Sequence, residues 1–415
     1  MQILRYELIK IFSRKSSILS LLGLFLCSVL IIFNSVSDAT YVYSDGSDVK
    51  GMKALTLLKT EKMKWNGQLT EAKIKKVIDE NSAINNKPEY VGINDNDVKL
   101  SNMNYAEKQG FMDIKDLINR AYGEFRSYDY YLIDSLKPLD AKNFYQNRIN
   151  QLKTWLSSDD SYQLNEQEKN YLLHSAITLS TPFHYSYADG WQTVLEYSLL
   201  IMYALFFAIC ILMAPVFSIE YQTGVAAIIL TSEQGKKRGV VLKLSAGLLS
   251  ISVIYFFTIL LTFGSTLLLY GTEGANCQIQ AYSSYFRSFY HVTNLQALSL
   301  IILLGYIACI FLGCLAMYLS ARLKSSFASI IIIVVLVIFP SIINQFLSTK
   351  SFVGKFISLF PDQMLIGWRL LNTYTFYNIF GKVITPYHVL PFIYILLLIL
   401  LLPLTYRSFQ LHQTK

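Results

Sequence analysis

The sequence predicts an all-α integral membrane protein with six transmembrane helices, an N-terminal helix at the membrane interface and a mostly helical domain between the first and second spans. Of its 415 residues, 53% are hydrophobic and only 15% are charged, whereas about a quarter of a soluble domain is usually charged. The apolar residues gather in long uninterrupted stretches. The charged residues gather in one segment, residues 38–191, and in short flanks of the apolar stretches.

Six stretches are long enough to cross a bilayer, whose hydrocarbon core of about 30 Å requires roughly 20 apolar residues in a helix. We expect spans at residues 16–37, 197–219, 244–272, 292–321, 325–349 and 383–406, none of which contains Asp, Glu, Lys or Arg. Ion-coupled transporters and proton pumps usually carry ionisable groups at membrane depth. The absence of these residues from the predicted spans therefore argues against a secondary transporter or a channel.

The distribution of charge predicts the orientation. Residues 38–191 hold 22 acidic and 19 basic residues, and the rest of the chain holds 6 acidic and 17 basic ones. Basic residues of short loops mark the cytoplasmic side, and here they flank the spans at both termini, in the 220–243 loop and between the fourth and fifth spans. We expect cytoplasmic termini, including a 407–415 tail, and residues 38–191 outside. The 350–382 segment, with four basic residues, fits this orientation least well.

Residues 1–15, "MQILRYELIKIFSRK", have the pattern of an amphipathic helix. Their side chains separate onto two faces, with Glu7, Lys10 and Arg14 on one face and Leu4, Leu8, Ile11 and Phe12 on the other. Such a helix lies along the membrane interface before the first span. The alternative is an ordinary basic flank.

The segment 38–191 is mostly helical by pattern, for example in "LTEAKIKKVIDE" and "AKNFYQNRINQLKTWL". Asn165 before "EQEKNYLLHSAI" is expected to cap a helix, and the segment is long enough for a core of its own. It contains none of the five cysteines. An exterior domain without disulfides favours the plasma membrane of a bacterium over an animal cell surface.

We expect no catalytic residue and no metal site. The sequence has no P-loop, H-E-x-x-H or G-x-S-x-G motif. His174, His184 and Asp189 are close enough in sequence to bind a metal, but surface polar residues are the preferred interpretation. The basic residues flank apolar runs, so a nucleic-acid partner is not expected.

Two further features leave alternatives open. Gly305, Cys309 and Gly313 recur at a spacing of four in the fourth span, which allows close helix approach; they line a dimer interface or pore, or they pack within the chain. Residues 350–382 contain an apolar patch too short to span. This segment is a re-entrant or interfacial helix, or an exterior loop lying on lipid.

The hairpin "FSIEYQTGVAAIILTSEQGKKRGVVLKL", residues 217–244, carries a family resemblance. With the N-terminal "ELIKIFSRKSSI" and the large exterior insertion, it resembles the membrane subunit of ABC exporters, specifically the ABC type-2 permease family in its Gram-positive branch. After "LTS" the chain reads "EQGKKRG", where many members have a Pro and a single Arg. In that family the hairpin forms a coupling helix that sits in a groove of the ATPase subunit. The residues implied in coupling are Glu220, Tyr221, Thr223, Gly224, Lys236, Lys237 and Arg238.

The resemblance implies an ATP-driven exporter of an amphiphilic substrate such as a peptide, an antibiotic or a lipid. ATP and Mg²⁺ would bind to a separate ATPase subunit, and this chain would hold no cofactor. It would pair with itself or with a homologous permease, surrounded by membrane lipid. The alternative is a membrane-anchored sensor or scaffold for peptide or cell-wall ligands.

Overall fold

The computed structural model describes residues 2–91, 97–161, 163–232, 235–343, 346 and 351–411. The chain is 74% helical with almost no sheet. Among the described residues, six helical segments are long and apolar enough to cross a membrane: Lys15–Asp38, Asp189–Gln222, Lys237–Tyr270, Asn294–Leu323, Ser326–Ile343 and Pro386–Gln410. The prediction of six such helices in a mostly helical protein is therefore confirmed.

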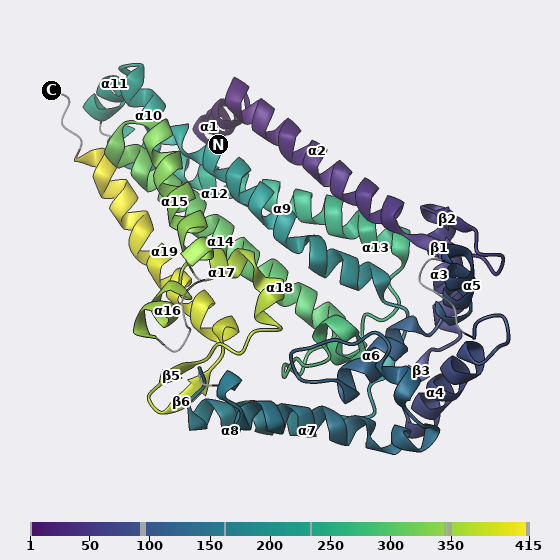
Figure 1. The fold of residues 1–415 in the computed structure, drawn as a ribbon. Helices are drawn as coiled ribbons and strands as arrows, with labels where there is room; N and C mark the ends of the chain where they lie inside the picture. Colours follow the sequence, from purple (N-terminus) through teal and green to yellow (C-terminus); the bar gives the residue numbers. More distant parts are fainter. Residues whose placement is uncertain are drawn as a thin grey trace.

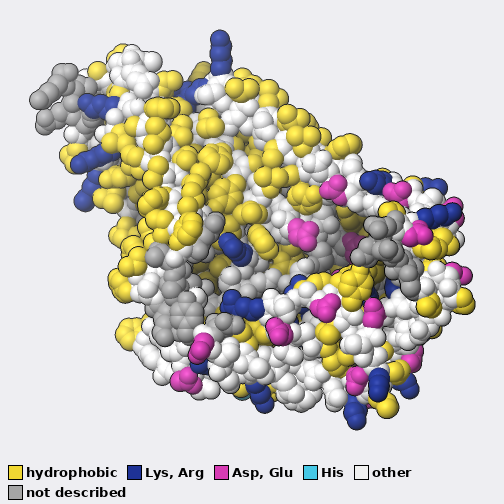
Figure 2. Space-filling view, in the orientation of Figure 1, with side chains coloured by type: hydrophobic (Ala, Val, Ile, Leu, Met, Phe, Trp, Pro, Cys, Tyr) yellow, Lys and Arg dark blue, Asp and Glu magenta, His cyan; other side chains and the backbone are white. Residues whose placement is uncertain are grey.

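The six segments form a bundle around α14 (Figure 1). Its elements are α2 (Lys15–Asp38), α9 (Asp189–Met213) with α10 (Pro215–Gln222), α12 (Val240–Ile259) with α13 (Ser265–Tyr270), α14 (Asn294–Leu323), α15 (Ser326–Ile343) and α19 (Pro386–Gln410). The central helix α14 packs against α9, α12, α15 and α19. The outer helices α2, α15 and α19 expose rows of Leu, Ile, Val and Phe, which appear as a continuous yellow surface in Figure 2. A surface of this kind is compatible with contact to lipid.

Helix α1 (Gln2–Phe12) lies across one end of the bundle and packs mainly against α12. Ile11 is buried, and Leu4, Leu8 and Phe12 pack against the core. We call this end, which also carries α10 and α11 (Val225–Thr231), the hairpin end. On the face shown in Figure 2, Lys and Arg stand at the hairpin end and Asp and Glu do not.

The opposite end carries residues 39–188, which we call the insert. It consists of α3 (Met52–Met63), α4 (Glu71–Asn85), α5 (Val98–Lys108), α6 (Met112–Tyr122), α7 (Phe144–Ser157) and α8 (Glu166–Ile177), with two antiparallel pairs, β1 (Thr40–Val42) with β2 (Asp48–Lys50) and β3 (Gly67–Gln68) with β4 (His184–Tyr185). The predicted cap of α8 is confirmed, because Asn165 Oδ1 accepts the Glu168 N–H at 2.9 Å and the Glu168 carboxylate accepts the Asn165 N–H at 2.9 Å.

The expectation that this segment has a core of its own requires correction. Phe125 and Trp155 of the insert share a hydrophobic cluster with Phe289 and Phe376, which lie far beyond it in the sequence. Buried Arg148 of α7 donates hydrogen bonds to the carbonyl oxygens of Phe286 and Ser288, each at 3.0 Å. The insert and the later loops of this end therefore form one structural unit.

Residues 351–385 belong to the same unit. They form α16 (Phe352–Ile357), α17 (Asp362–Leu365), α18 (Gly367–Leu370) and the hairpin of β5 (Tyr377–Ile379) and β6 (Lys382–Ile384). Helices α17 and α18 pack against α14 and α9, so this part folds back onto the bundle. The expected end of the fifth span, at residues 344–345 and 347–349, lies outside the described residues.

The small residues of α14 pack within the chain. A Cβ atom built on Gly313 would lie 2.4 Å from Ile251 Cδ1 of α12, and one built on Gly305 would lie 2.5 Å from Met202 Sδ of α9. Cys309, between them, is fully buried. Of the alternatives from the sequence, these contacts support close packing of α14 against α9 and α12.

This packing yields a test with a matched control. Gly313→Leu should lower the free energy of unfolding by about 1–3 kcal/mol, because overpacking forces neighbouring side chains out of their rotamers. Gly23→Leu in α2 should not, because no atom lies within 4 Å of a Cβ at Gly23. Both changes remove a helical glycine, so unfolding of the two variants in the same detergent isolates the packing effect. Equal stabilities would show that α14 tolerates a side chain at Gly313.

Candidate functional site

The hairpin between α9 and α12 begins at a break in the second span. Pro215 is the first residue of α10 and has no N–H to continue the hydrogen bonding of α9. The N–H groups of Phe217 and Ser218 are bonded instead by Ser320 Oγ of α14, at 3.1 and 2.8 Å. One hydroxyl of α14 thus satisfies two donors of a helix start, which would otherwise be buried without a partner.

The far end of α10 is fastened to α14 and α19. Tyr221 donates its hydroxyl to Ala321 O at 3.1 Å, and its ring lies 5.6 Å from that of Phe409 in α19. Gln222 Nε2 donates to Lys324 O at 3.3 Å. Tyr221, one of the predicted coupling residues, therefore joins the hairpin to two spans.

Gly224 reverses the chain after α10. Its φ of +74° lies in the left-handed region, which glycine adopts without steric cost at a helix C-terminus. The preceding Thr223 hydroxyl donates to Ile219 O at 2.8 Å inside α10. These two predicted residues shape the turn.

Helix α11 forms the tip of the hairpin. Val225 is 40% exposed and Ile228 is 73% exposed, while Ala226 is buried. The helix stands at the extremity of the hairpin end (Figure 1). The tip therefore offers apolar side chains beyond the packed bundle.

The basic turn follows as a π-helical stretch, Gly235–Gly239, which leads into α12. Lys237 and Arg238 have exposed side chains. The side chain of Lys236 and the residues Glu233 and Gln234 lie outside what the structure describes.

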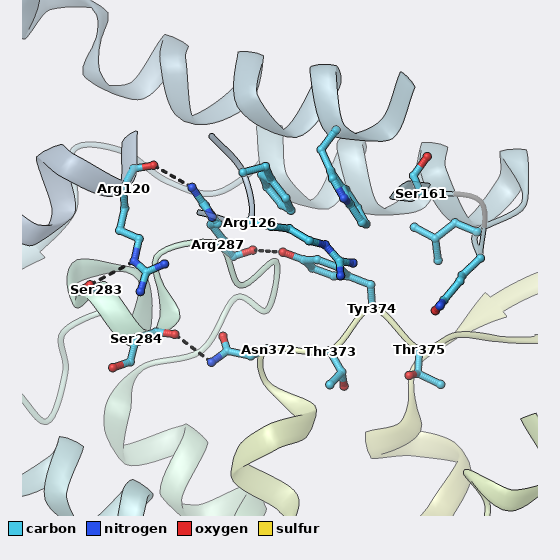
Figure 3. Close-up of a pocket in the computed structure, with 14 residues that line it drawn as sticks. Arg120, Arg126, Ser161, Ser283, Ser284, Arg287, Asn372, Thr373, Tyr374 and Thr375 are labelled. Carbon is cyan, nitrogen blue, oxygen red and sulfur yellow. Dashed lines mark hydrogen bonds between the residues drawn. The ribbon is translucent and has the colours of Figure 1, made fainter. Parts of the chain in front are cut away.

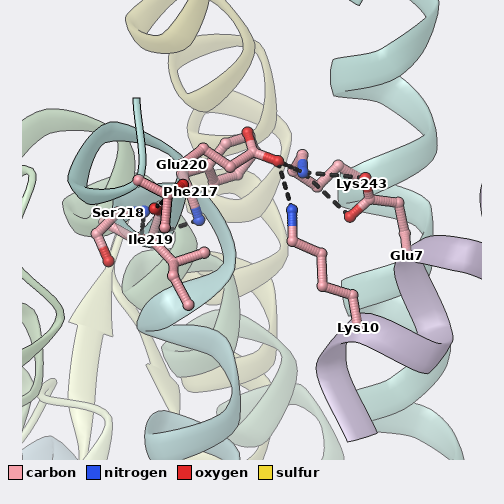
Figure 4. A network of polar contacts seen from close by, with 9 residues as sticks. Glu7, Lys10, Phe217, Ser218, Ile219, Glu220 and Lys243 are labelled. Atoms are coloured by element: carbon pink, nitrogen blue, oxygen red, sulfur yellow. Dashed lines mark hydrogen bonds and ion pairs between the residues drawn. The ribbon is translucent and has the colours of Figure 1, made fainter. Parts of the chain in front are cut away.

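Glu220 is not on the surface but in a buried ion-pair cluster (Figure 4). Its side chain is 1% exposed and that of Lys243 in α12 is 2% exposed, and the two are directly paired. Lys10 of α1 bonds the same Glu220 oxygen at 2.8 Å. Lys243 also contacts both carboxylate oxygens of Glu7 in α1, at 3.1 and 3.0 Å.

This cluster joins α1, α10 and α12. A buried charge is very costly unless it is paired, and here two carboxylates meet two ammonium groups. The second Glu220 oxygen, Oε2, is buried without a hydrogen-bond partner among the described residues. The cluster thus holds the base of the hairpin rigidly to the N-terminal helix, and one acceptor position stays open.

The sequence indicated part of this site. Four of the predicted residues lie together at the end of α10 and the following turn: Glu220, Tyr221, Thr223 and Gly224. The sequence did not predict that Glu220 would contact Lys10 and Lys243, or that Lys243 would also bind Glu7. Lys10 and Glu220 are 210 positions apart. The available signal was that Glu7 and Lys10 share one face of α1, while Glu220 and Lys243 border two successive spans.

The structure offers no support for the metal alternative. Within the described ranges, no group of three His, Cys, Asp or Glu side chains is arranged to hold a metal ion. Asp189 instead pairs with Lys62 of α3 at 2.9 Å.

Comparison of the chain with models of protein families, with curated proteins and with solved structures finds no match.

The ion-pair cluster yields a double-mutant test. Lys243→Met should lower the free energy of unfolding by about 3 kcal/mol, because Glu7 and Glu220 lose their shared partner inside the protein. Adding Glu220→Gln should recover part of this loss, since it removes one of the two carboxylate charges that Lys243 neutralised. The measurement is unfolding of the two single variants and the double variant.

The control is Arg238→Gln on the exposed turn, where a charge contributes little to stability. If the effects of Lys243→Met and Glu220→Gln simply add, the two residues are not energetically coupled.

Proposed function

We propose that this protein is the membrane-spanning permease subunit of an ATP-driven ABC exporter of the type-2 class. The observation that carries the proposal is the construction of the hairpin. Its base is fixed to α1, α12 and α14 by ion pairs and hydrogen bonds and to α19 by the aromatic contact of Tyr221 with Phe409, and its tip, α11, exposes Val225 and Ile228. An apolar tip could bind to the ATPase subunit, and a rigid base would pass the movement of the tip on to the spans.

The sequence has no P-loop, so an exporter of this kind must receive work from a separate ATPase through a surface. A displacement of α11 would pass through Gly224 to α10. From there it would reach α14 through Ser320 and α1 through Glu220. ATP and Mg²⁺ would remain in the partner, and this chain would carry no catalytic residue.

The distribution of charge supports an orientation. The basic segments that flank the spans meet at the hairpin end, which would be cytoplasmic by the rule for basic loops. The insert would then be an extracellular domain, and α1 would be an elbow helix along the inner interface of a bacterial plasma membrane. A second permease, identical or homologous, would complete a path for an amphiphilic peptide, antibiotic or lipid.

The orientation can be tested by labelling. Leu139→Cys in the insert should react with a membrane-impermeant maleimide in intact cells, and Ile228→Cys in α11 should react only after lysis. These positions suit the comparison because Leu139 is 75% and Ile228 is 73% exposed. The native cysteines are buried or half-buried and serve as the unlabelled background. The reverse labelling pattern would invert the orientation.

The docking surface can be tested by co-purification. From a mild detergent extract, the wild-type protein should retain a stoichiometric ATPase subunit. Ile228→Glu, and separately Lys237→Glu with Arg238→Glu, should reduce that retention by about tenfold, a loss of roughly 1.4 kcal/mol in binding. A change of this size is expected when a charge enters an apolar contact or when the sign of a charge is reversed.

Leu139→Glu is the matched control, because it places the same charge at an equally exposed leucine of the other end. Reproducible absence of any ATPase with folded wild-type protein would overturn the exporter and favour the membrane-anchored sensor or scaffold. Retention unaffected by the tip variants would remove α11 as the docking element.

A further inference from the structure

A cavity of about 470 Å³ lies at the insert end (Figure 3). It is formed by segments far apart in the sequence: the end of α6 with the following loop, Trp155 of α7 with the nearby Ser161, Gln163 and Leu164, residues 283–287, and residues 372–375. Asn372 Nδ2 donates to Ser284 O at 2.8 Å, and Tyr374 donates its hydroxyl to Arg287 O at 3.0 Å. The walls are therefore held together by hydrogen bonds between segments.

The charged groups that line this cavity are all positive. Arg120, Arg126 and Arg287 contribute guanidinium groups, and no Asp or Glu is among the lining residues. In the described part of the chain, none of the three arginines forms an ion pair. By contrast, Lys62 of the insert is paired with two carboxylates.

Aromatic rings and backbone carbonyls hold the guanidinium groups in place. Arg287 lies 4.8 Å from the ring centroid of Phe125 and donates to the carbonyl oxygens of Arg120 and Glu124 at 3.2 and 2.6 Å. Arg126 lies 5.0 Å from the ring of Trp155, which itself stacks on Phe125 at 4.8 Å. A guanidinium group that rests on a ring keeps its N–H edge available for a ligand.

The arginines repel one another. Burial, together with the nearby charge of Arg120, lowers the pKa of Arg287 to about 10, so that it still carries its charge at neutral pH. An anion in the cavity would relieve this repulsion.

We propose that this cavity binds a phosphate-type oxyanion through Arg120, Arg126 and Arg287. The planar fork of arginine matches the oxygens of phosphate in bidentate geometry. Three such groups without a carboxylate suit a multiply charged phosphate or pyrophosphate better than a single carboxylate. This site is distinct from the hairpin end and does not depend on an ATPase.

Two sources of the oxyanion fit the surroundings. Thr373 and Thr375 also line a second cavity of about 560 Å³, which reaches Leu199 and Leu200 of α9. If the phosphate is the headgroup of a lipid, the acyl chains of that lipid could lie in the second cavity, against Leu199 and Leu200 of α9. A free phosphate compound would occupy the arginine cavity alone.

The experiment uses the full-length protein in nanodiscs of phosphatidylcholine, which has no net charge. Inorganic pyrophosphate is titrated calorimetrically, and in a parallel arm dihexanoyl phosphatidic acid is added instead. Binding of both ligands supports the site. Binding of phosphatidic acid alone identifies a lipid-borne phosphate, and binding of pyrophosphate alone identifies a free one.

Variants tie the binding to the cavity. Arg126→Gln should weaken it by about tenfold or more, as expected for loss of a charge-assisted hydrogen bond. Arg126 has an exposed side chain, so this variant should fold even if Arg287→Gln, which loosens the loop contacts, does not. Arg322→Gln, at an exposed arginine of the hairpin end, should leave the affinity unchanged. Absence of binding by both ligands, or binding that Arg126→Gln leaves intact, would overturn the proposal.

Discussion

Lys243 lies where α1, α10 and α12 meet, and its ammonium group is shared between the carboxylates of Glu220 and Glu7. The arrangement of the hairpin end depends on this shared contact. Removing an ammonium group from water is so costly that the structure must keep both acids beside it. These ion pairs hold α1 against the bases of α10 and α12.

The two ends of the molecule differ in how their charged side chains are paired. At the hairpin end, the buried side chains of Glu220 and Lys243 are paired, and α11 exposes apolar side chains at the tip. At the insert end, the three arginines of the cavity form no ion pair among the described residues, whereas Lys62 of the insert is paired with two carboxylates. The first arrangement suits a surface that transmits force to the helices behind it. The second arrangement suits a binding site for a negatively charged ligand.

The sequence was sufficient for the spans and for the helical nature of the insert, because both follow from local patterns of apolar residues. Residue pattern also predicted the cap at Asn165. The residue pattern did not predict the contact of Lys10 with Glu220 or of Arg287 with Phe125. Such contacts depend on packing between segments more than a hundred residues apart. The second span was expected to end at residue 219, yet the helical segment continues to Gln222. The break at Pro215 is tolerated because Ser320 of α14 accepts the N–H groups of Phe217 and Ser218.

Phe289 and Phe376 complete the hydrophobic cluster that contains Phe125 and Trp155 of the insert. A ribosome makes the insert long before it reaches Phe376, and by then five of the six apolar helices have been synthesised. Domains usually fold as they emerge during synthesis. The insert, however, leaves part of its aromatic cluster exposed until Phe289 and Phe376 have been synthesised. Translation order therefore creates an interval in which the insert depends on a chaperone, or on its own solubility, until the last loop arrives. A fragment ending before Phe376 would remain in that incomplete state.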